Sequence, residues 1–204
     1  MSVQTHIANI VILANSHNPS ILSAEWLDKY SIMPGATLKI QVPDVSIMET
    51  NSINMIADQN RLQFVVKEFS EEGIKQCQIA AIKYFETLPH LPYQAIGYNF
   101  HYFLAERSLP LPINTKLADK DLAELLGVKL TSQGLLVYWQ DQEAQCRLSL
   151  EAGQYKDKVP EIIFNFHFEP ISDCAEAKRH LEKFTLLYFR CRELANLLDS
   201  EMGK

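Results

Sequence analysis

The chain has 204 residues, of which 47% are hydrophobic and 22% charged, so it can bury a core of its own without metal or disulfide staples. Its 19 Lys and Arg against 25 Asp and Glu give a net charge of −6, and the basic residues are scattered. Nucleic-acid binding draws on a basic surface that neutralises phosphates, so this composition argues against it.

Hydropathy and cysteine spacing point to a cytoplasmic protein. The apolar run at residues 7–14 has no basic residue before it, which favours a first strand over a signal peptide. No apolar stretch approaches the roughly 20 residues that cross a membrane. The four cysteines form no CxxC pair, which predicts reduced thiols rather than a disulfide framework or a zinc site. We expect no cofactor and no membrane partner.

The first half, residues 1–92, predicts the element order β-α-β-β-β-α. Asn18 is a suitable N-cap with Pro19 at the first helical position, and Ser70 is a suitable N-cap for the second helix. Strands are expected at residues 7–14, 38–42, 46–57 and 62–69, and helices at 18–30 and 70–88.

The second half, residues 93–204, predicts the same order again. Its last helix begins at Ser172 and carries apolar residues at alternating spacings of three and four. Strands are expected at residues 93–105, 134–140, 146–152 and 160–169, and helices at 119–126 and 172–200.

The predicted fold is therefore α+β, with two tandem halves fused in one globular unit and helices packed on one face of antiparallel sheet. This layout is similar to duplicated folds such as the TATA-box-binding-protein-like fold. That likeness is topological, and function does not follow from it.

Three stretches, NPSILSAEWL, NRLQFVV and LPYQAIGYNF, resemble an uncharacterised bacterial protein family that is common in cyanobacteria. The resemblance covers mainly the first 105 residues. None of the three stretches is a catalytic signature, and the resemblance implies no known activity.

A doubled motif, YNFHYF at residues 98–103 and FNFHFE at 164–169, defines the candidate binding site. Because side chains alternate along a strand, one face is expected in the core and the other opposite to it. The core side consists of Tyr98, Phe100, Tyr102, Phe164, Phe166 and Phe168, and Phe103 lies with the polar residues on the opposite face. That polar face would be a half-solvated or interface surface, a ligand-binding patch, or a metal site with Glu169 as third ligand. Its candidate ligand-binding residues are Asn99, His101, Asn165, His167 and Glu169.

The remaining histidines and the tryptophans read as structural. His17 and His90 are expected in loops, and His180 on the solvated, charged side of the last helix. Trp26 and Trp139 are expected to anchor the core.

The last helix is apolar over most of its circumference, which predicts burial on two sides. Either the first half or a second chain supplies the second surface, and a twofold homodimer is the simplest form of the latter. The candidate interface residues are Phe189, Leu194 and Leu197.

Common catalytic signatures are missing: the sequence has no phosphate loop, G-x-G-x-x-G, G-x-S-x-G or H-E-x-x-H motif. We therefore expect a non-catalytic binding or assembly protein whose partner is itself or another protein. The alternative is a small-molecule or metal-assisted site on the face of Asn99, His101, Asn165 and His167.

Overall fold

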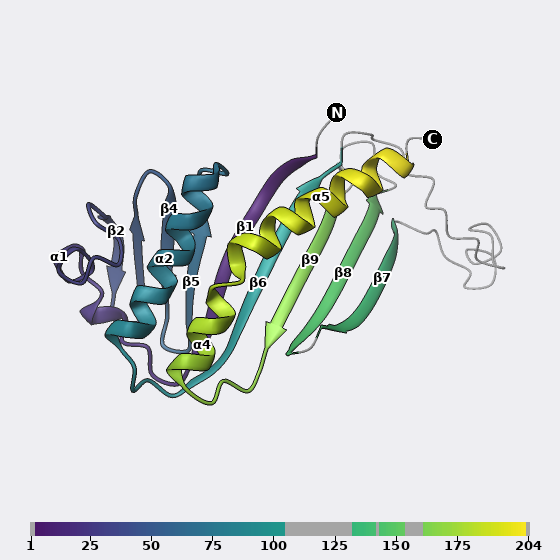
Figure 1. The fold of residues 1–204 in the computed structure, drawn as a ribbon. Coiled ribbons are helices and arrows are strands. Elements are labelled where there is room, and N and C mark those ends of the chain that lie inside the picture. Colours follow the sequence, from purple (N-terminus) through teal and green to yellow (C-terminus); the bar gives the residue numbers. More distant parts are fainter. Residues whose placement is uncertain (1–2, 105–131, 142, 154–160, 203–204) are drawn as a thin grey trace, which may run out of the picture.

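A computed structural model of the chain describes residues 3–104, 132–141, 143–153 and 161–202. Within these ranges the chain forms one nine-stranded sheet with helices over one of its faces (Figure 1), which confirms the predicted α+β class. The strands are β1 (Gln4–Ala14), β2 (Thr37–Val42), β3 (Val45–Glu49), β4 (Ile53–Ala57), β5 (Arg61–Val66), β6 (Tyr93–Phe103), β7 (Ser132–Asp141), β8 (Ala144–Gly153) and β9 (Glu161–Phe168). The helices are the 3-10 turn η1 (Pro19–Ile21), α1 (Ala24–Lys29), α2 (Glu71–Thr87), α4 (Cys174–Leu181) and α5 (Phe184–Met202).

The sheet is antiparallel throughout, and its strand order is β2-β3-β4-β5-β1-β6-β9-β8-β7. The long strands β1 and β6 pair at its centre, and β2 and β7 form its two edges. Helices α2, α4 and α5 cross the same face, and no helix of the described residues lies over the other face (Figure 1). We call the covered side the helix face and the other the outer face.

Two predicted elements of the first half divide in the structure. The strand expected at residues 46–57 is two strands, β3 and β4, because Thr50 Oγ1 accepts hydrogen bonds from the amides of Ser52 and Ile53 and closes a turn. The helix expected at residues 18–30 is the turn η1, capped by Asn18, followed by a separate helix α1 capped by Ser23. The helix predicted at residues 119–126 lies outside the described residues.

The core lies between the helix face and the helices, as strand alternation predicts. Six aromatic residues of the doubled motif are at most 5% exposed and face the helices; they are Tyr98, Phe100, Tyr102, Phe164, Phe166 and Phe168. Phe184 of α5 sits over two of them, with its ring centroid 5.2 Å from Tyr98 and 5.3 Å from Phe100. The expectation that these six residues face the core is confirmed, and Phe103, the remaining aromatic of the motif, is half-buried.

Helix α2 follows the sequence closely. Ser70 caps it by accepting a hydrogen bond from the amide of Gly73 at 3.1 Å, and Ile74, Cys77 and Phe85 of its apolar stripe are buried. At Gly73 a Cβ atom would collide with the carbonyl oxygen of Glu68, so this close approach requires glycine.

The single helix predicted at residues 172–200 is wrong: the structure has two helices, α4 and α5, with a break between them. Asp173, rather than Ser172, caps α4. At the break the carbonyl oxygen of His180 accepts a hydrogen bond from the buried Tyr98 hydroxyl at 2.7 Å and one from the amide of Lys183 at 2.9 Å. The break thus satisfies a buried hydroxyl and redirects α5 diagonally across the second half of the sheet (Figure 1). None of the helices in the described ranges is long and apolar enough to span a membrane.

Candidate functional site

Four polar side chains lie abreast on the outer face and form one hydrogen-bonded row across four strands. The register aligns Asn9 of β1 with Asn99 of β6, Asn99 with Asn165 of β9, and Asn165 with Arg147 of β8. Asn99 Nδ2 donates to Asn9 Oδ1 at 2.7 Å, and Asn165 Nδ2 donates to Asn99 Oδ1 at 2.5 Å. We call these four residues the asparagine row.

Arg147 sets the direction of the asparagine row. Its Nε and Nη2 both donate to Asn165 Oδ1, at 2.9 and 2.6 Å. A guanidinium can only donate, so Asn165 must turn its carbonyl toward β8 and its amide toward Asn99, which then turns the same way. The row is therefore a chain of aligned amides that starts at a fixed cation.

Sequence reasoning found the middle of this row but missed Asn9, which is only 6% exposed, and gave Arg147 no role. The doubled motif marked Asn99 and Asn165. The available signal for Asn9 was a single amide inside the apolar run of residues 7–14.

The two strand histidines share the outer face but do not lie together. His101 is aligned with Ile163, four residues from His167 on β9, or roughly 13 Å along the strand. His101 Nδ1 lies 2.8 Å from Glu161, and His167 Nε2 lies 2.8 Å from Glu169, so each histidine has its own carboxylate. A compact patch of two asparagines and two histidines is therefore not formed, and no group of three or more potential metal ligands occurs in the described ranges.

A small hollow of about 240 Å³ opens beside the asparagine row on the outer face. Gly97 of β6 provides its floor, because this residue has no side chain between Val11 and His167 on the neighbouring strands. Asn99, Asn165 and Arg147 line one side. We call this cavity the outer-face hollow.

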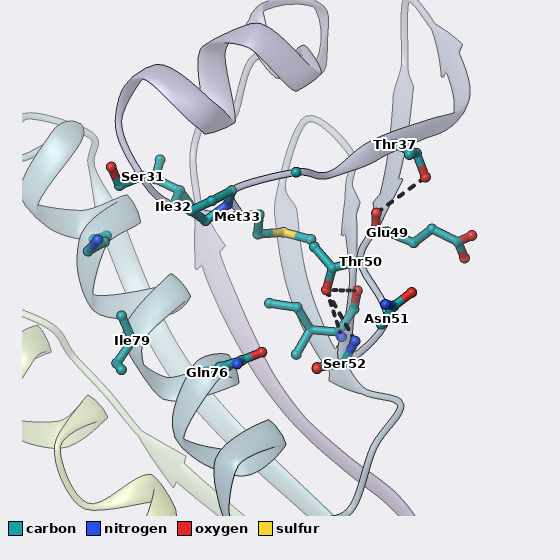
Figure 2. Close-up of a pocket in the computed structure, with 14 residues that line it drawn as sticks. Ser31, Ile32, Met33, Thr37, Glu49, Thr50, Asn51, Ser52, Gln76 and Ile79 are labelled. Carbon is teal, nitrogen blue, oxygen red and sulfur yellow. Dashed lines mark hydrogen bonds between the residues drawn. The ribbon is translucent and has the colours of Figure 1, made fainter.

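A cleft of about 540 Å³ lies at the other end of the molecule, between α2, the segment after α1 and the β3–β4 turn. Figure 2 shows Gln76 and Ile79 of α2 on one side and the turn of Thr50 and Ser52 on the other. Two polar side chains here are engaged: Thr50 bonds within its own turn, and Gln76 donates to Glu72. The cleft thus has room for a ligand, and its lining also includes the polar side chains of Ser31, Asn51 and Lys83.

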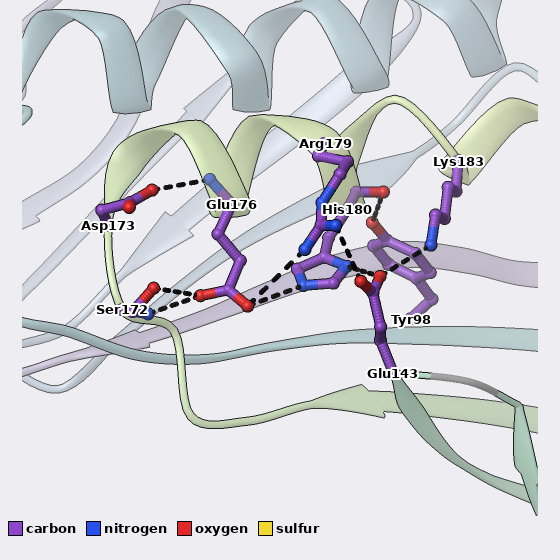
Figure 3. Close-up of polar contacts among 8 residues, drawn as sticks. All are labelled: Tyr98, Glu143, Ser172, Asp173, Glu176, Arg179, His180 and Lys183. Carbon is purple, nitrogen blue, oxygen red and sulfur yellow. Dashed lines mark hydrogen bonds and ion pairs between the residues drawn. The ribbon is translucent and has the colours of Figure 1, made fainter.

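A charged cluster surrounds His180 at the end of α4 (Figure 3). The ring lies between Glu143 of the β7–β8 turn, 3.6 Å from Nδ1, and Glu176, 3.8 Å from Nε2. Glu143 also pairs with Arg179 at 2.8 Å and with Lys183 at 3.0 Å. Because the two carboxylates face opposite ring nitrogens, they cannot chelate one metal ion with His180, and the cluster instead ties α4 to the turn.

The expectation that His180 is solvated is wrong, since it is only 2% exposed and packs against the ring of Phe168 at 4.5 Å. Burial lowers its pKa, although the glutamates around it act in the opposite direction. His17 is also 2% exposed: Nδ1 lies 2.8 Å from the Tyr84 hydroxyl and Nε2 lies 3.3 Å from the Ile12 carbonyl. Burial lowers the pKa of His17 too, so both are neutral structural histidines near pH 7.

The thiols offer no nucleophile. All four cysteines are free, as the sequence predicts, and three of them are buried. Burial raises the pKa of Cys77, Cys191 and Cys174, and raises that of Cys146 to about 11, so thiolate is scarce at neutral pH.

Apolar side chains are exposed where α5 leaves the last two strands partly uncovered. On α5, Leu186 is 70% exposed, Leu197 60% and Leu194 42%. On the helix face of β7, Leu135, Val137 and Trp139 are 37–39% exposed. Trp139 is therefore not the core anchor expected from the sequence. We call these six residues the α5–β7 surface.

Of the interface residues predicted on the last helix, Leu194 and Leu197 belong to this surface. Phe189 is half-buried, packs against the core and contacts the Tyr188 ring edge-on at 5.1 Å. Between α5 and the strands lie two shallow hollows of about 310 and 280 Å³, which share Phe166, Leu187 and Arg190 in their walls.

A scan against models of protein families finds no family that matches this chain, and a search among curated proteins finds no match. The resemblance to a bacterial family therefore stays a prediction.

Proposed function

We propose that this chain is a non-catalytic, cytoplasmic assembly protein that binds a second copy of itself through the α5–β7 surface. The observation that carries the proposal is the exposure of three leucines on one helix beside an apolar edge strand. Leu186, Leu194 and Leu197 together expose somewhat less surface than two fully exposed leucine side chains. Burying this surface stabilises the dimer by about 3–5 kcal/mol per copy. The free cysteines support a reducing compartment.

The two edges of the sheet differ in a way that favours pairing at β7. Edge strand β2 carries Lys39 and an irregular register between Leu38 and Ile40, two features that discourage strand addition. Edge strand β7 pairs with β8 in an unbroken register and has no charged residue before Asp141. Among the described strands, nothing pairs with its other side.

A second copy suits this edge because antiparallel pairing of identical strands is self-complementary. A pair centred on Val137 would set Leu135 of one copy opposite the partner subunit's Trp139, both on the helix face. The same rotation would bring the two α5 helices toward each other, so that their exposed leucines are covered at the same time.

Sedimentation velocity at micromolar concentration tests the proposal. We expect a species of twice 23.3 kDa, the mass of one chain. A 23.3 kDa monomer at tens of micromolar would overturn the proposal, even if another part of the same chain covered the α5–β7 surface.

Two variants locate the interface. Leu197→Glu removes burial worth about 1–2 kcal/mol in each copy, so the dimer should weaken roughly 30-fold or more. Val137→Lys places a charge on the strand edge and should also give monomers. Ile79→Glu on α2, at a helix position 49% exposed, is the matched control and should leave the dimer intact. Circular dichroism must show that all three remain folded.

We also propose that the chain is an internal duplication of residues 1–92 and 93–204. Counting outward from the centre, the first half runs β1-β5-β4-β3-β2 and the second half runs β6-β9-β8-β7. In each half a helix follows the second strand of this order: α2 follows β5, and α4 and α5 follow β9. A twofold axis between β1 and β6 would relate them, with one extra strand in the first half. Superposing β1 on β6 and β5 on β9 tests this; if α2 and α5 then fail to coincide, the duplication is wrong.

A further inference from the structure

The outer-face hollow combines a fixed cation, amide donors and an apolar wall. Arg147 is held by two hydrogen bonds to Asn165, and the amides of Asn99 and Asn165 are turned by the same interaction. The other side is formed by Val11, Leu13 and Ala95. Such a cavity resembles ligand sites, where a few convergent polar groups lie in an otherwise apolar pocket.

Arg147 has N–H groups left to bind a ligand in addition to those that donate to Asn165 of the asparagine row. Of its five N–H groups, Nε and one on Nη2 serve Asn165, which leaves one on Nη2 and two on Nη1. One N–H from each terminal nitrogen forms the parallel pair that binds both oxygens of a carboxylate. Because the guanidinium is already immobilised, less rotamer entropy is lost when the ligand binds.

Charge selects the kind of anion. In the described part of the chain no Asp or Glu lines the hollow, and no carboxylate lies within ion-pair distance of Arg147. His167 is already paired with Glu169, so among the described residues that line the hollow Arg147 is the one cation without a carboxylate partner. A single positive charge matches a monoanion, whereas a phosphate dianion would keep an unbalanced charge beside an apolar wall.

We propose that the outer-face hollow binds a small aliphatic monocarboxylate, with its carboxylate on Arg147 and its apolar tail over Gly97. The volume of about 240 Å³ is below the range typical of drug-sized ligands, which limits the tail to a few carbons. The role of Gly97 is to leave the space open. A Cβ atom there would meet only the Phe166 carbonyl at 3.5 Å and Val11 Cβ at 4.0 Å, which are ordinary contacts, so the fold itself does not demand glycine.

Titration of the full chain with butyrate, followed by NMR of the side-chain amide signals of Asn99 and Asn165, tests the proposal. We expect saturable shifts with butyrate and none with butyramide, which has a similar shape but no charge. Equal shifts with both, or tighter binding of inorganic phosphate than of butyrate, would overturn it.

Two variants test whether butyrate binds in the outer-face hollow, and a third is the control. Arg147→Gln can still donate to Asn165 but lacks the cation, and should weaken butyrate binding by about tenfold or more. Gly97→Val fills the hollow with a residue suited to strands and should abolish the shifts. Arg190→Gln, on α5 at the helix face, removes the same charge elsewhere and should leave affinity within about twofold. Undiminished binding in either Arg147→Gln or Gly97→Val would refute the assignment.

Discussion

Replacing Asn99 with alanine tests the asparagine row at its centre. The change removes two hydrogen bonds, one to Asn9 at 2.7 Å and one from Asn165 at 2.5 Å. It also leaves the side-chain oxygen Oδ1 of Asn9 without a hydrogen-bond donor, although Asn9 is only 6% exposed. With about 1 kcal/mol net for each bond and a further cost for the stranded acceptor, we expect a loss of roughly 2–3 kcal/mol in unfolding free energy.

Urea unfolding followed by circular dichroism measures this loss at one fixed protein concentration, because dimer formation would make stability depend on concentration. In a thermal scan the same change should lower Tm by about 5–10 °C. Asn51→Ala, in the exposed β3–β4 turn, is the matched control and should change the free energy by no more than about 0.5 kcal/mol.

A double variant separates the row from a general effect of asparagine loss. If Asn99 and Asn165 act through their shared hydrogen bond, the combined alanine variant should be less damaging than the two single losses together, by about 1 kcal/mol. The row would be refuted as a stabilising unit if the losses were additive, or if Asn99→Ala behaved like Asn51→Ala.

Three further predictions concern buried groups. Because burial lowers the pKa values of His17 and His180, the unfolded chain takes up protons first as pH falls below about 6.5. Unfolding free energy should therefore fall between pH 6.5 and 5, by up to about 1.4 kcal/mol per pH unit for each histidine, and a flat profile in urea titrations would contradict this. Tyr98→Phe removes the hydroxyl that donates to the His180 carbonyl at the α4–α5 break and should cost about 1–2 kcal/mol by urea unfolding; no loss would show that the bond is unimportant. Gly73→Ala should cost about 1–3 kcal/mol in the same assay, because its Cβ would collide with Glu68, and a neutral result would mean that the loop moves freely.

Much of the fold was predictable because strand alternation and helix capping are local. The doubled motif assigned Tyr98 and Phe166 to the core correctly, since the period of two depends only on neighbouring residues. Ser70 was recognisable as the cap of α2 for the same reason. The turn at Thr50 was missed because its hydrogen bonds come from a hydroxyl within a run that otherwise reads as one strand.

The candidate site was only partly predictable because it depends on strand register. Asn99 and Asn165 were marked by their repeated motif, but nothing local aligns Asn9 and Arg147 with them. The same limit explains His180, whose burial follows from contacts with the sheet and the β7–β8 turn. To predict which side chains lie next to each other on neighbouring strands, one needs the strand order and register, and a single sequence does not give them.

The two proposed surfaces lie on opposite faces of the sheet, so they should act independently. Two residues connect them: Tyr138 of β7 is aligned with Arg147 of β8, and Phe166 of β9, which lines the hollow, contacts Trp139 edge-on with ring centroids 6.2 Å apart. Two sites are coupled only when each of them binds two conformations of the protein with different affinity. Neither the guanidinium of Arg147, which is already held by Asn165, nor the β7 edge needs a second conformation in order to bind. Saturating butyrate should therefore change the dimer dissociation constant by less than about twofold in sedimentation, and dilution below that constant should leave butyrate affinity unchanged. A larger effect would show that the edge strand moves when the hollow is filled. Tyr138→Ala should then reduce the coupling if the coupling passes through Tyr138, and leave it unchanged if it passes through Phe166.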